Sequence, residues 1–133
     1  MSDPFAPINA SIAQTLDTLL PRQSDIAQPM VDAMRYAVLG GGKRLRPLMT
    51  CAACHAFGGD YQPALPAACG FEFIHAYSLI HDDLPAMDDD NLRHGQAATH
   101  IAFGEANAIL AGDSLHSLAF QSLAEAPAIS DAA

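Results

Sequence analysis

Apolar residues recur along most of this 133-residue chain at intervals of three and four positions, which is the spacing of one face of an α-helix. The pattern predicts five helices, which run from Pro4 to Leu20, from near Pro29 to the glycines at 40–42, from Pro47 to Phe57, from Pro63–Pro66 toward Asp82, and from Glu105 to Ala124. Proline and glycine stand at several of these ends, where proline suits a first turn and glycine ends a helix. No run of alternating apolar and polar residues indicates a sheet. The sequence therefore predicts an all-α protein.

The composition narrows the class of protein further. Half of the residues are hydrophobic, so we expect residues 1–133 to form a single domain with a core and a disordered tail at 126–133. The first residues do not resemble a secretory signal, no apolar stretch is long enough to span a membrane, and three cysteines fit a reducing compartment. We therefore expect a cytoplasmic protein without stable membrane insertion. A net charge of −9 argues against a basic surface for nucleic acid.

Charged residues gather in two places, and the acidic cluster gives the sharper signal. Five of the fifteen acidic residues lie between Asp82 and Asp90, directly after a predicted apolar helix. Carboxylates there meet the negative end of the helix dipole and repel one another, by roughly 1 kcal/mol for two of them about 5 Å apart in water. Mg²⁺ would offset this cost, because it prefers oxygen ligands and often takes one or two carboxylates together with substrate phosphates. The alternative is a solvated acidic turn.

The basic cluster occupies the predicted junction between two helices. Residues 40–47 read Gly-Gly-Gly-Lys-Arg-Leu-Arg-Pro, so that Lys43, Arg44 and Arg46 stand where the next helix begins. Glycines that allow close approach, free N–H groups of a first helical turn, and lysine and arginine side chains all favour a phosphate ligand. The spacing of a Walker P-loop is absent, and a flexible basic turn is the alternative. Together the two clusters indicate a site for two diphosphates, one bound by cations and one by carboxylate-held metal.

Both clusters resemble motifs of the trans-isoprenyl diphosphate synthases. Residues 41–47 are similar to the basic motif of that family, and residues 82–88 resemble its first aspartate-rich motif in the bacterial form. The likeness extends over residues 30–123, and two linked motifs in this order are highly specific. The resemblance implies an orthogonal all-α helical bundle of the isoprenoid synthase type, of which this chain carries the N-terminal part. It also implies a short-chain prenyltransferase, of farnesyl or geranyl type and usually a homodimer, which condenses isopentenyl diphosphate with dimethylallyl or geranyl diphosphate.

The resemblance assigns the acidic residues to catalysis with Mg²⁺. By position, Asp82 and Asp88 would ligate Mg²⁺ on the allylic diphosphate, with Asp83 supporting them. Arg93 would hold the same diphosphate, and metal and arginine together would stabilise the charge that develops as the allylic cation forms. His75 and Asp82 are seven residues apart, so both lie on one face of the helix.

The same comparison assigns the basic residues to isopentenyl diphosphate. Lys43, Arg46 and His75 would bind this substrate, and Arg44 of the same motif belongs to the substrate-binding set. His94 stands where the family has a second arginine for isopentenyl diphosphate. A neutral imidazole supplies less charge than an arginine and cannot make a bidentate contact with phosphate. This departure from the family affects the isopentenyl diphosphate site and leaves the metal site unchanged.

Product length is assigned to Tyr77 and Ser78, which lie five and four residues before Asp82. Tyr77 would project about one helical turn deeper than the metal site. In this respect the chain resembles members of the family that have a bulky residue at that position and whose product has fifteen carbons. The position argues against a longer-chain polyprenyl diphosphate synthase, which is one alternative.

A second aspartate-rich motif of the family does not occur in these residues. We therefore expect the chain alone to be inactive, and to be stable only with a dimer partner or with the rest of the family's fold. A non-catalytic diphosphate-binding homologue or partner subunit is the alternative. Cys51 and Cys54 are spaced like a metal or redox pair, but two alanines between them within a predicted helix favour simple core positions.

Overall fold

The structure, a computed structural model, describes residues 2–127. Over this range the elements follow one another as α1 (Ala6–Leu19), α2 (Gln28–Leu39), α3 (Leu45–Ala56), the 3₁₀ turn η1 (Gln62–Ala64), α4 (Leu65–Asp82), β1 (Leu92–Arg93), β2 (Gln96–Ala97), α5 (Thr99–Phe103) and α6 (Glu105–Ala124). The prediction of a helical protein is confirmed, and the five long helices lie where the apolar spacing placed them. Residues 128–133, which make up most of the predicted tail, lie outside the described range.

The helix boundaries follow from the local sequence. Proline stands in the first two positions of α1, α2 and α4, where its missing N–H removes no helical hydrogen bond. Helix α3 begins at Leu45, two residues before the predicted start at Pro47. Pro47 thus lies in the first turn of α3, whose N–H groups have no partner within the helix, so the proline is tolerated there.

A short β-hairpin at residues 92–97 corrects the prediction that the chain contains no sheet. Leu92 pairs with Ala97 and Arg93 with Gln96 in antiparallel register. The two residues of the turn between the strands, 94 and 95, have φ angles of 51° and 75°, and a type I′ hairpin turn requires positive φ at both positions. Strands of two residues are too short to show an alternating pattern, which is why the apolar spacing did not reveal them.

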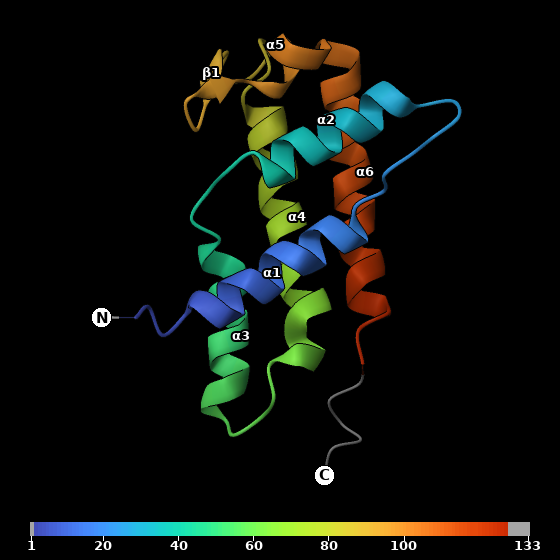
Figure 1. The fold of residues 1–133 in the computed structure, drawn as a ribbon. Helices are drawn as coiled ribbons and strands as arrows, with labels where there is room; N and C mark the ends of the chain where they lie inside the picture. Colours follow the sequence, from blue (N-terminus) through green and yellow to red (C-terminus); the bar gives the residue numbers. More distant parts are fainter. Residues whose placement is uncertain (1, 128–133) are drawn as a thin grey trace.

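Helices α4 and α6 form a long antiparallel pair at the centre of the fold, as Figure 1 shows. Helices α1 and α2 cross this pair, α3 lies along the first half of α4, and the hairpin and α5 lie at the end where α4 stops and α6 starts (Figure 1). The end of α4 therefore meets the hairpin, and the loop between α2 and α3 runs beside α4. These are the two segments in which the sequence placed its charged clusters.

Glycine allows the close approach of α4 and α6. A Cβ atom at Gly112 would lie 2.2 Å from Nε2 of His81, and one at Gly70 would lie 3.1 Å from the carbonyl oxygen of Ala119. The imidazole of His81 occupies the space at Gly112, where its Nε2 lies 3.0 Å from the carbonyl oxygen of Ile109. The last turn of α4 is thereby fixed against α6 immediately before the acidic cluster.

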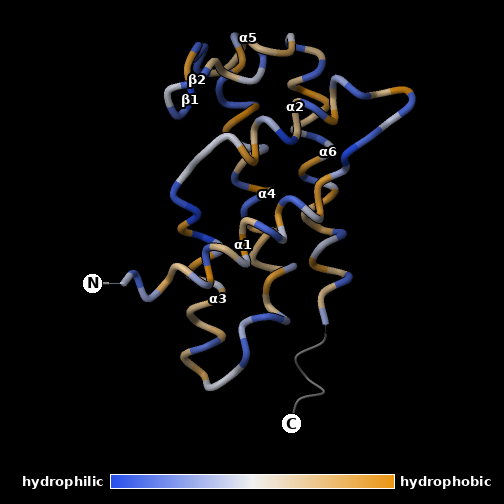
Figure 2. The backbone as a smooth tube through the Cα atoms, in the orientation of Figure 1, coloured by the Kyte–Doolittle hydropathy of each residue, from blue (hydrophilic) through white to orange (hydrophobic). Residues whose placement is uncertain are grey.

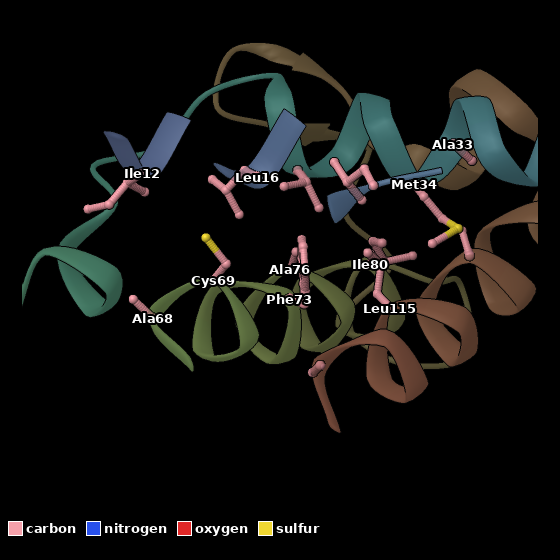
Figure 3. Packing of buried hydrophobic residues seen from close by; sticks show 14 of the residues in the cluster. Ile12, Leu16, Ala33, Met34, Ala68, Cys69, Phe73, Ala76, Ile80 and Leu115 are labelled. Atoms are coloured by element: carbon pink, nitrogen blue, oxygen red, sulfur yellow. The ribbon is translucent and has the colours of Figure 1, made fainter. Parts of the chain in front are cut away.

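The hydrophobic core lies between α4 on one side and the crossing helices α1 and α2 on the other. Figure 3 shows Ile12 and Leu16 of α1 facing the row of side chains on α4 that includes Phe73 and Ile80. Leu115 brings α6 into the same cluster. Phe73 is fully buried and is the largest of the fully buried side chains within residues 2–127, so it contributes the largest single apolar area to this core.

Two of the three cysteines belong to this apolar interior. Cys51 and Cys69 are fully buried, and burial raises the pKa of both thiols, to about 12 for Cys69. Thiols with raised pKa values remain protonated near neutral pH, and the thiol is neither a nucleophile nor a metal ligand. The interpretation of Cys51 as a core residue is confirmed. For Cys54 it is wrong, because this side chain is only partly buried near the end of α3, where its thiol donates to the carbonyl oxygen of Asp60 at 3.4 Å.

Hydrophobic and hydrophilic residues are interleaved along each long helix, as Figure 2 shows. Within the described part of the chain, no helix combines the length and the apolar character needed to cross a membrane. Helices α1, α2 and α3 each have an apolar side that packs inward and a more polar side, which is the amphipathic pattern of a helical bundle. Helix α6 differs from them, because Ile109, Leu110 and Phe120 are exposed on it.

Phe73→Ala should lower the free energy of unfolding by about 3–5 kcal/mol, because it removes a fully buried aromatic ring and leaves a cavity. Phe71→Ala is the matched control, since Phe71 lies on the same helix but is half exposed and should cost roughly 0.5 kcal/mol. Urea denaturation followed by circular dichroism measures both. Equal losses for the two variants would contradict the placement of the core.

Candidate functional site

The acidic cluster begins at the end of α4. Asp82 is the last residue of this helix and Asp83 is its C-cap, as the sequence predicted. The following turn folds back, so that the N–H of Asp88 donates to the carbonyl oxygen of Asp82 at 2.8 Å and that of Asp90 to the carbonyl oxygen of Asp83 at 3.1 Å. These bonds satisfy carbonyl groups that the end of a helix leaves free, and they hold Asp88 beside Asp82.

Asp82 and Asp88 have free carboxylates. Within residues 2–127 neither side chain takes part in a hydrogen bond or a salt bridge; Asp82 is half-buried and Asp88 is exposed. In the same part of the chain, no group of three or more His, Cys, Asp and Glu side chains is arranged to hold a metal ion. Two free carboxylates therefore fit Mg²⁺ only as a partial ligand set, which phosphate oxygens and water would complete.

Asp83 differs from its two neighbours because it is buried and paired. Only 2 % of its surface is exposed, and Arg93 of the hairpin donates to both carboxylate oxygens, at 3.1 Å from Nε and 2.5 Å from Nη2. The hydrogen bond with Asp83 raises the pKa of the Arg93 guanidinium. This bidentate pair places the hairpin over the end of α4 and engages both carboxylate oxygens of Asp83.

The basic cluster forms one wall of a cavity of about 300 Å³ beside α4. Lys43 and Arg46 are exposed along this cavity, and His75 and Glu72 line it from α4. Gly41 and Gly42 have φ angles of 140° and 112°, a backbone conformation that side chains with a Cβ rarely adopt. The glycines thus allow the loop to turn so that the cations face α4.

Arg44 behaves differently from the two cations that flank it. Its guanidinium forms a salt bridge with Glu72, with 2.8 Å between Nη1 and Oε1, and it also donates to the carbonyl oxygen of Val38. Glu72 is 5 % exposed. The structure thus brings Arg44 to the predicted site but engages it with a buried carboxylate that the sequence reasoning did not single out. Glu72 precedes His75 by one helical turn, so the spacing could have placed it on the same face.

His75 is half-buried in the cavity wall. Burial lowers the pKa of its imidazole, and the positive charge of Arg46 lowers it further. A neutral imidazole near pH 7 has one donor and one acceptor nitrogen. His75 can therefore hydrogen-bond a ligand in this cavity without adding charge to the pair formed by Lys43 and Arg46.

His94 links the two clusters. It lines the basic cavity and also a smaller one, of about 40 Å³, which Asp83 and Arg93 line as well. A Cβ atom at Gly42 would lie 3.7 Å from Nε2 of His94, so the hairpin and the basic loop lie against each other. The acidic and basic clusters thus border neighbouring cavities along one side of α4.

Tyr77 and Ser78 lie away from these two cavities. The ring of Tyr77 packs edge-on against His116 of α6 at 5.0 Å and against His81 at 5.6 Å. The hydroxyl of Ser78 donates to the carbonyl oxygen of His75 at 2.7 Å. Tyr77 therefore lies on the side of α4 that faces α6. The sequence did not predict the contact between Tyr77 and His116, because an isolated histidine on a helix gives no sign of its partners.

Comparisons with known proteins identify the family of this chain. The sequence profile described as Polyprenyl synthetase matches residues 27–133. The chain is 57% identical over 102 residues to the farnesyl diphosphate synthase of Haemophilus influenzae, covering 77% of this chain and 35% of the relative, and 56% identical over 105 residues to that of Escherichia coli, with the same shares. It is also 50% identical over 115 residues to the large subunit 1 of a heterodimeric geranylgeranyl pyrophosphate synthase of Arabidopsis thaliana, covering 86% of this chain and 30% of the relative.

Solved structures show the same fold. An FPP/GFPP synthase from Zymomonas mobilis superposes with a TM-score of 0.85 at 47% identity, over 90% of this chain and 43% of the other. The geranylgeranyl pyrophosphate synthetase of the archaeon Geoglobus acetivorans gives 0.87 at 36% identity, over 95% and 40%. The chain spans about a third of the length of the curated relatives it matches. The all-α isoprenoid synthase fold expected from the motifs is confirmed, and the chain belongs to the polyprenyl synthetase family.

Proposed function

We propose that this chain provides the diphosphate-binding side of a short-chain trans-prenyl diphosphate synthase. The reaction is the Mg²⁺-dependent condensation of isopentenyl diphosphate with dimethylallyl or geranyl diphosphate, which gives geranyl or farnesyl diphosphate. The observation that carries the proposal is the position of the two clusters along α4: free carboxylates stand at and just after the end of the helix, and a cationic cavity lies beside its preceding turns. The named relatives include both farnesyl and geranylgeranyl synthases, so they do not by themselves define the product length. In this proposal product length is assigned to Tyr77.

Each cluster serves one substrate in the proposed reaction. Asp82 and Asp88 would hold Mg²⁺ on the allylic diphosphate, and the bound ion would supply positive charge to the departing group. Arg93, oriented by Asp83, donates to the same diphosphate as the allylic C–O bond breaks. Lys43 and Arg46 bind isopentenyl diphosphate, so that its double bond is held next to the allylic cation.

The substrates also define the partners in this proposal. Isopentenyl and allylic diphosphates are the ligands, and a second copy of the chain or the remaining part of the family's fold completes the cleft. A turnover assay with Mg²⁺, dimethylallyl diphosphate and labelled isopentenyl diphosphate tests the reaction: this chain alone should give no extended product, whereas a protein that joins it to the remaining part of the family's fold should. Binding measurements test the two substrate sites separately.

Binding of Mg²⁺ and of an allylic diphosphate should be strongly coupled, because two carboxylates complete the coordination of the ion only with phosphate oxygens. Asp82→Asn and Asp88→Asn should each weaken this coupling by about tenfold or more, as expected for the loss of a charged ligand. Asp89→Asn is the matched control: Asp89 is exposed, and asparagine tolerates its φ of 53°. Isothermal calorimetry measures all three variants. Unchanged coupling in the first two would refute the metal assignment.

His94→Arg should tighten the binding of isopentenyl diphosphate by about tenfold at pH 7, because arginine adds a permanent charge and a bidentate donor at the cavity edge. Affinity for the allylic diphosphate should change by less than about twofold. The same calorimetric titrations measure both substrates. An equal effect on the two would show that His94 does not belong to the isopentenyl diphosphate site.

The imidazole of His75 should titrate below its ordinary pKa of about 6.5, because it is partly desolvated and faces Arg46. A lowered pKa in the folded state means that His75 stabilises the fold fully above about pH 6.5, and that this contribution decreases as pH falls toward the folded pKa. Arg46→Gln should raise the His75 pKa in an NMR titration, whereas Arg22→Gln, in the loop after α1 where Arg22 pairs with Asp17, should not. A His75 pKa that does not respond to Arg46 would contradict the geometry of the cavity.

A further inference from the structure

A buried carboxylate lines the cavity that is proposed to bind a diphosphate. Glu72 is 5 % exposed and shares this cavity with Lys43 and Arg46. A carboxylate repels phosphate, and its burial is unfavourable unless it is paired. Since Glu72 is buried and lies within the helix α4, water does not solvate its carboxylate, and its charge must be compensated within the protein.

Arg44 provides that compensation through two contacts. Nη1 lies 2.8 Å from Oε1 of Glu72, and Nη2 donates to the carbonyl oxygen of Val38, in the last turn of α2. Arg44 is itself the N-cap of α3, with a φ of 50°. One guanidinium therefore joins the end of α2, the start of α3 and the middle of α4.

This arrangement separates Arg44 in function from the cations on either side of it. Its side chain is 19% exposed and is held by two protein groups, whereas Lys43 and Arg46 are exposed along the cavity. The left-handed backbone at residue 44 is unfavourable for a residue with a Cβ, so it persists only where other contacts hold it. Here the side-chain contacts with Glu72 and Val38 act together with the hydrogen bond from the N–H of Leu48 to the carbonyl oxygen of Arg44, at 3.1 Å.

We propose that Arg44 and Glu72 form a positioning pair: Arg44 neutralises Glu72 and fixes the loop 41–46, so that Lys43 and Arg46 meet the diphosphate, and Arg44 is not itself a phosphate ligand. This inference rests on the proposed function of the cavity. It replaces the sequence-based assignment of Arg44 to substrate binding. In the opposite reading, Arg44 leaves Glu72 when the ligand arrives and binds phosphate directly.

A double-mutant cycle separates these readings, with inorganic pyrophosphate as the probe and calorimetry as the measurement. Arg44→Gln should weaken binding by at least about tenfold, because it leaves the Glu72 charge uncompensated beside the ligand. Glu72→Gln in the same chain should recover at least about threefold of that loss, since the repelling charge is gone. Glu72→Gln alone should change binding by less than about twofold, because Arg44 already compensates that charge. An equal gain from Glu72→Gln with and without Arg44 would mean that Arg44 is a direct ligand, and would also overturn the proposal. A double variant no tighter than Arg44→Gln alone would overturn the proposal.

A second measurement uses the unmodified chain and so does not depend on the folding of any variant. The side-chain Nε–H resonances of Arg44 and Arg46 are followed by NMR while pyrophosphate is added. The Arg46 resonance should shift, and the Arg44 resonance should remain close to its starting position. A shift of Arg44 as large as that of Arg46 would overturn the proposal even if the double variant binds well.

Lys43→Gln and Arg46→Gln test the proposed function separately. Both should weaken pyrophosphate binding, in the original chain and in the Glu72→Gln background alike. If neither does, or if the original chain binds no pyrophosphate, the proposed function of the cavity fails, and the positioning role fails with it. If both do, while the cycle shows no recovery and the Arg44 resonance shifts, only the positioning role fails.

Discussion

The packing of α4 against α1, α2 and α6 fixes the helix to which both parts of the candidate site are attached. Phe73 and Ile80 are buried on one side of α4, and His75 and Asp82 stand on another. The seven residues between His75 and Asp82 correspond to about 10 Å along the helix axis, since each residue of an α-helix rises by about 1.5 Å. A rigid helix thus sets the spacing between the basic cavity and the acidic end, and the proposed reaction uses this spacing to place two diphosphate substrates side by side.

The distribution of positive charge supports the same picture. The chain has six lysine and arginine residues, all within the described range. Four of them, Arg22, Arg35, Arg44 and Arg93, form salt bridges with carboxylates. The other two, Lys43 and Arg46, have no carboxylate partner in that range and line the larger cavity together. In a chain with a net charge of −9, two cations without a carboxylate partner in one cavity indicate that an anion from outside the chain belongs there.

Sequence reasoning predicted those features that depend on neighbours along the chain. The long helices follow from the apolar spacing, and the position of Asp82 and Asp83 at a helix end follows from the helix before them. The pairing of Arg44 with Glu72 could not be predicted, because the two residues are 28 positions apart and meet only after α2, α3 and α4 have packed. The same holds for the hairpin, whose position depends on the contact between Arg93 and buried Asp83 rather than on any local strand pattern.

Glu72 and Asp83 repeat one arrangement on the same side of α4. They are eleven residues apart, which is about three helical turns, and each buried carboxylate holds an arginine from a separate loop. A buried ion pair is weak evidence for a gain in folding stability. It does keep its two partners together, because either charge alone would be costly to bury. The two loops then meet each other, since Nε2 of Gln96 donates to the carbonyl oxygen of Gly40 at 2.8 Å. In the proposed reaction the segments that bind the two diphosphates are therefore attached to one helix and to one another, so that a displacement of either loop would change the distance between the reacting carbons.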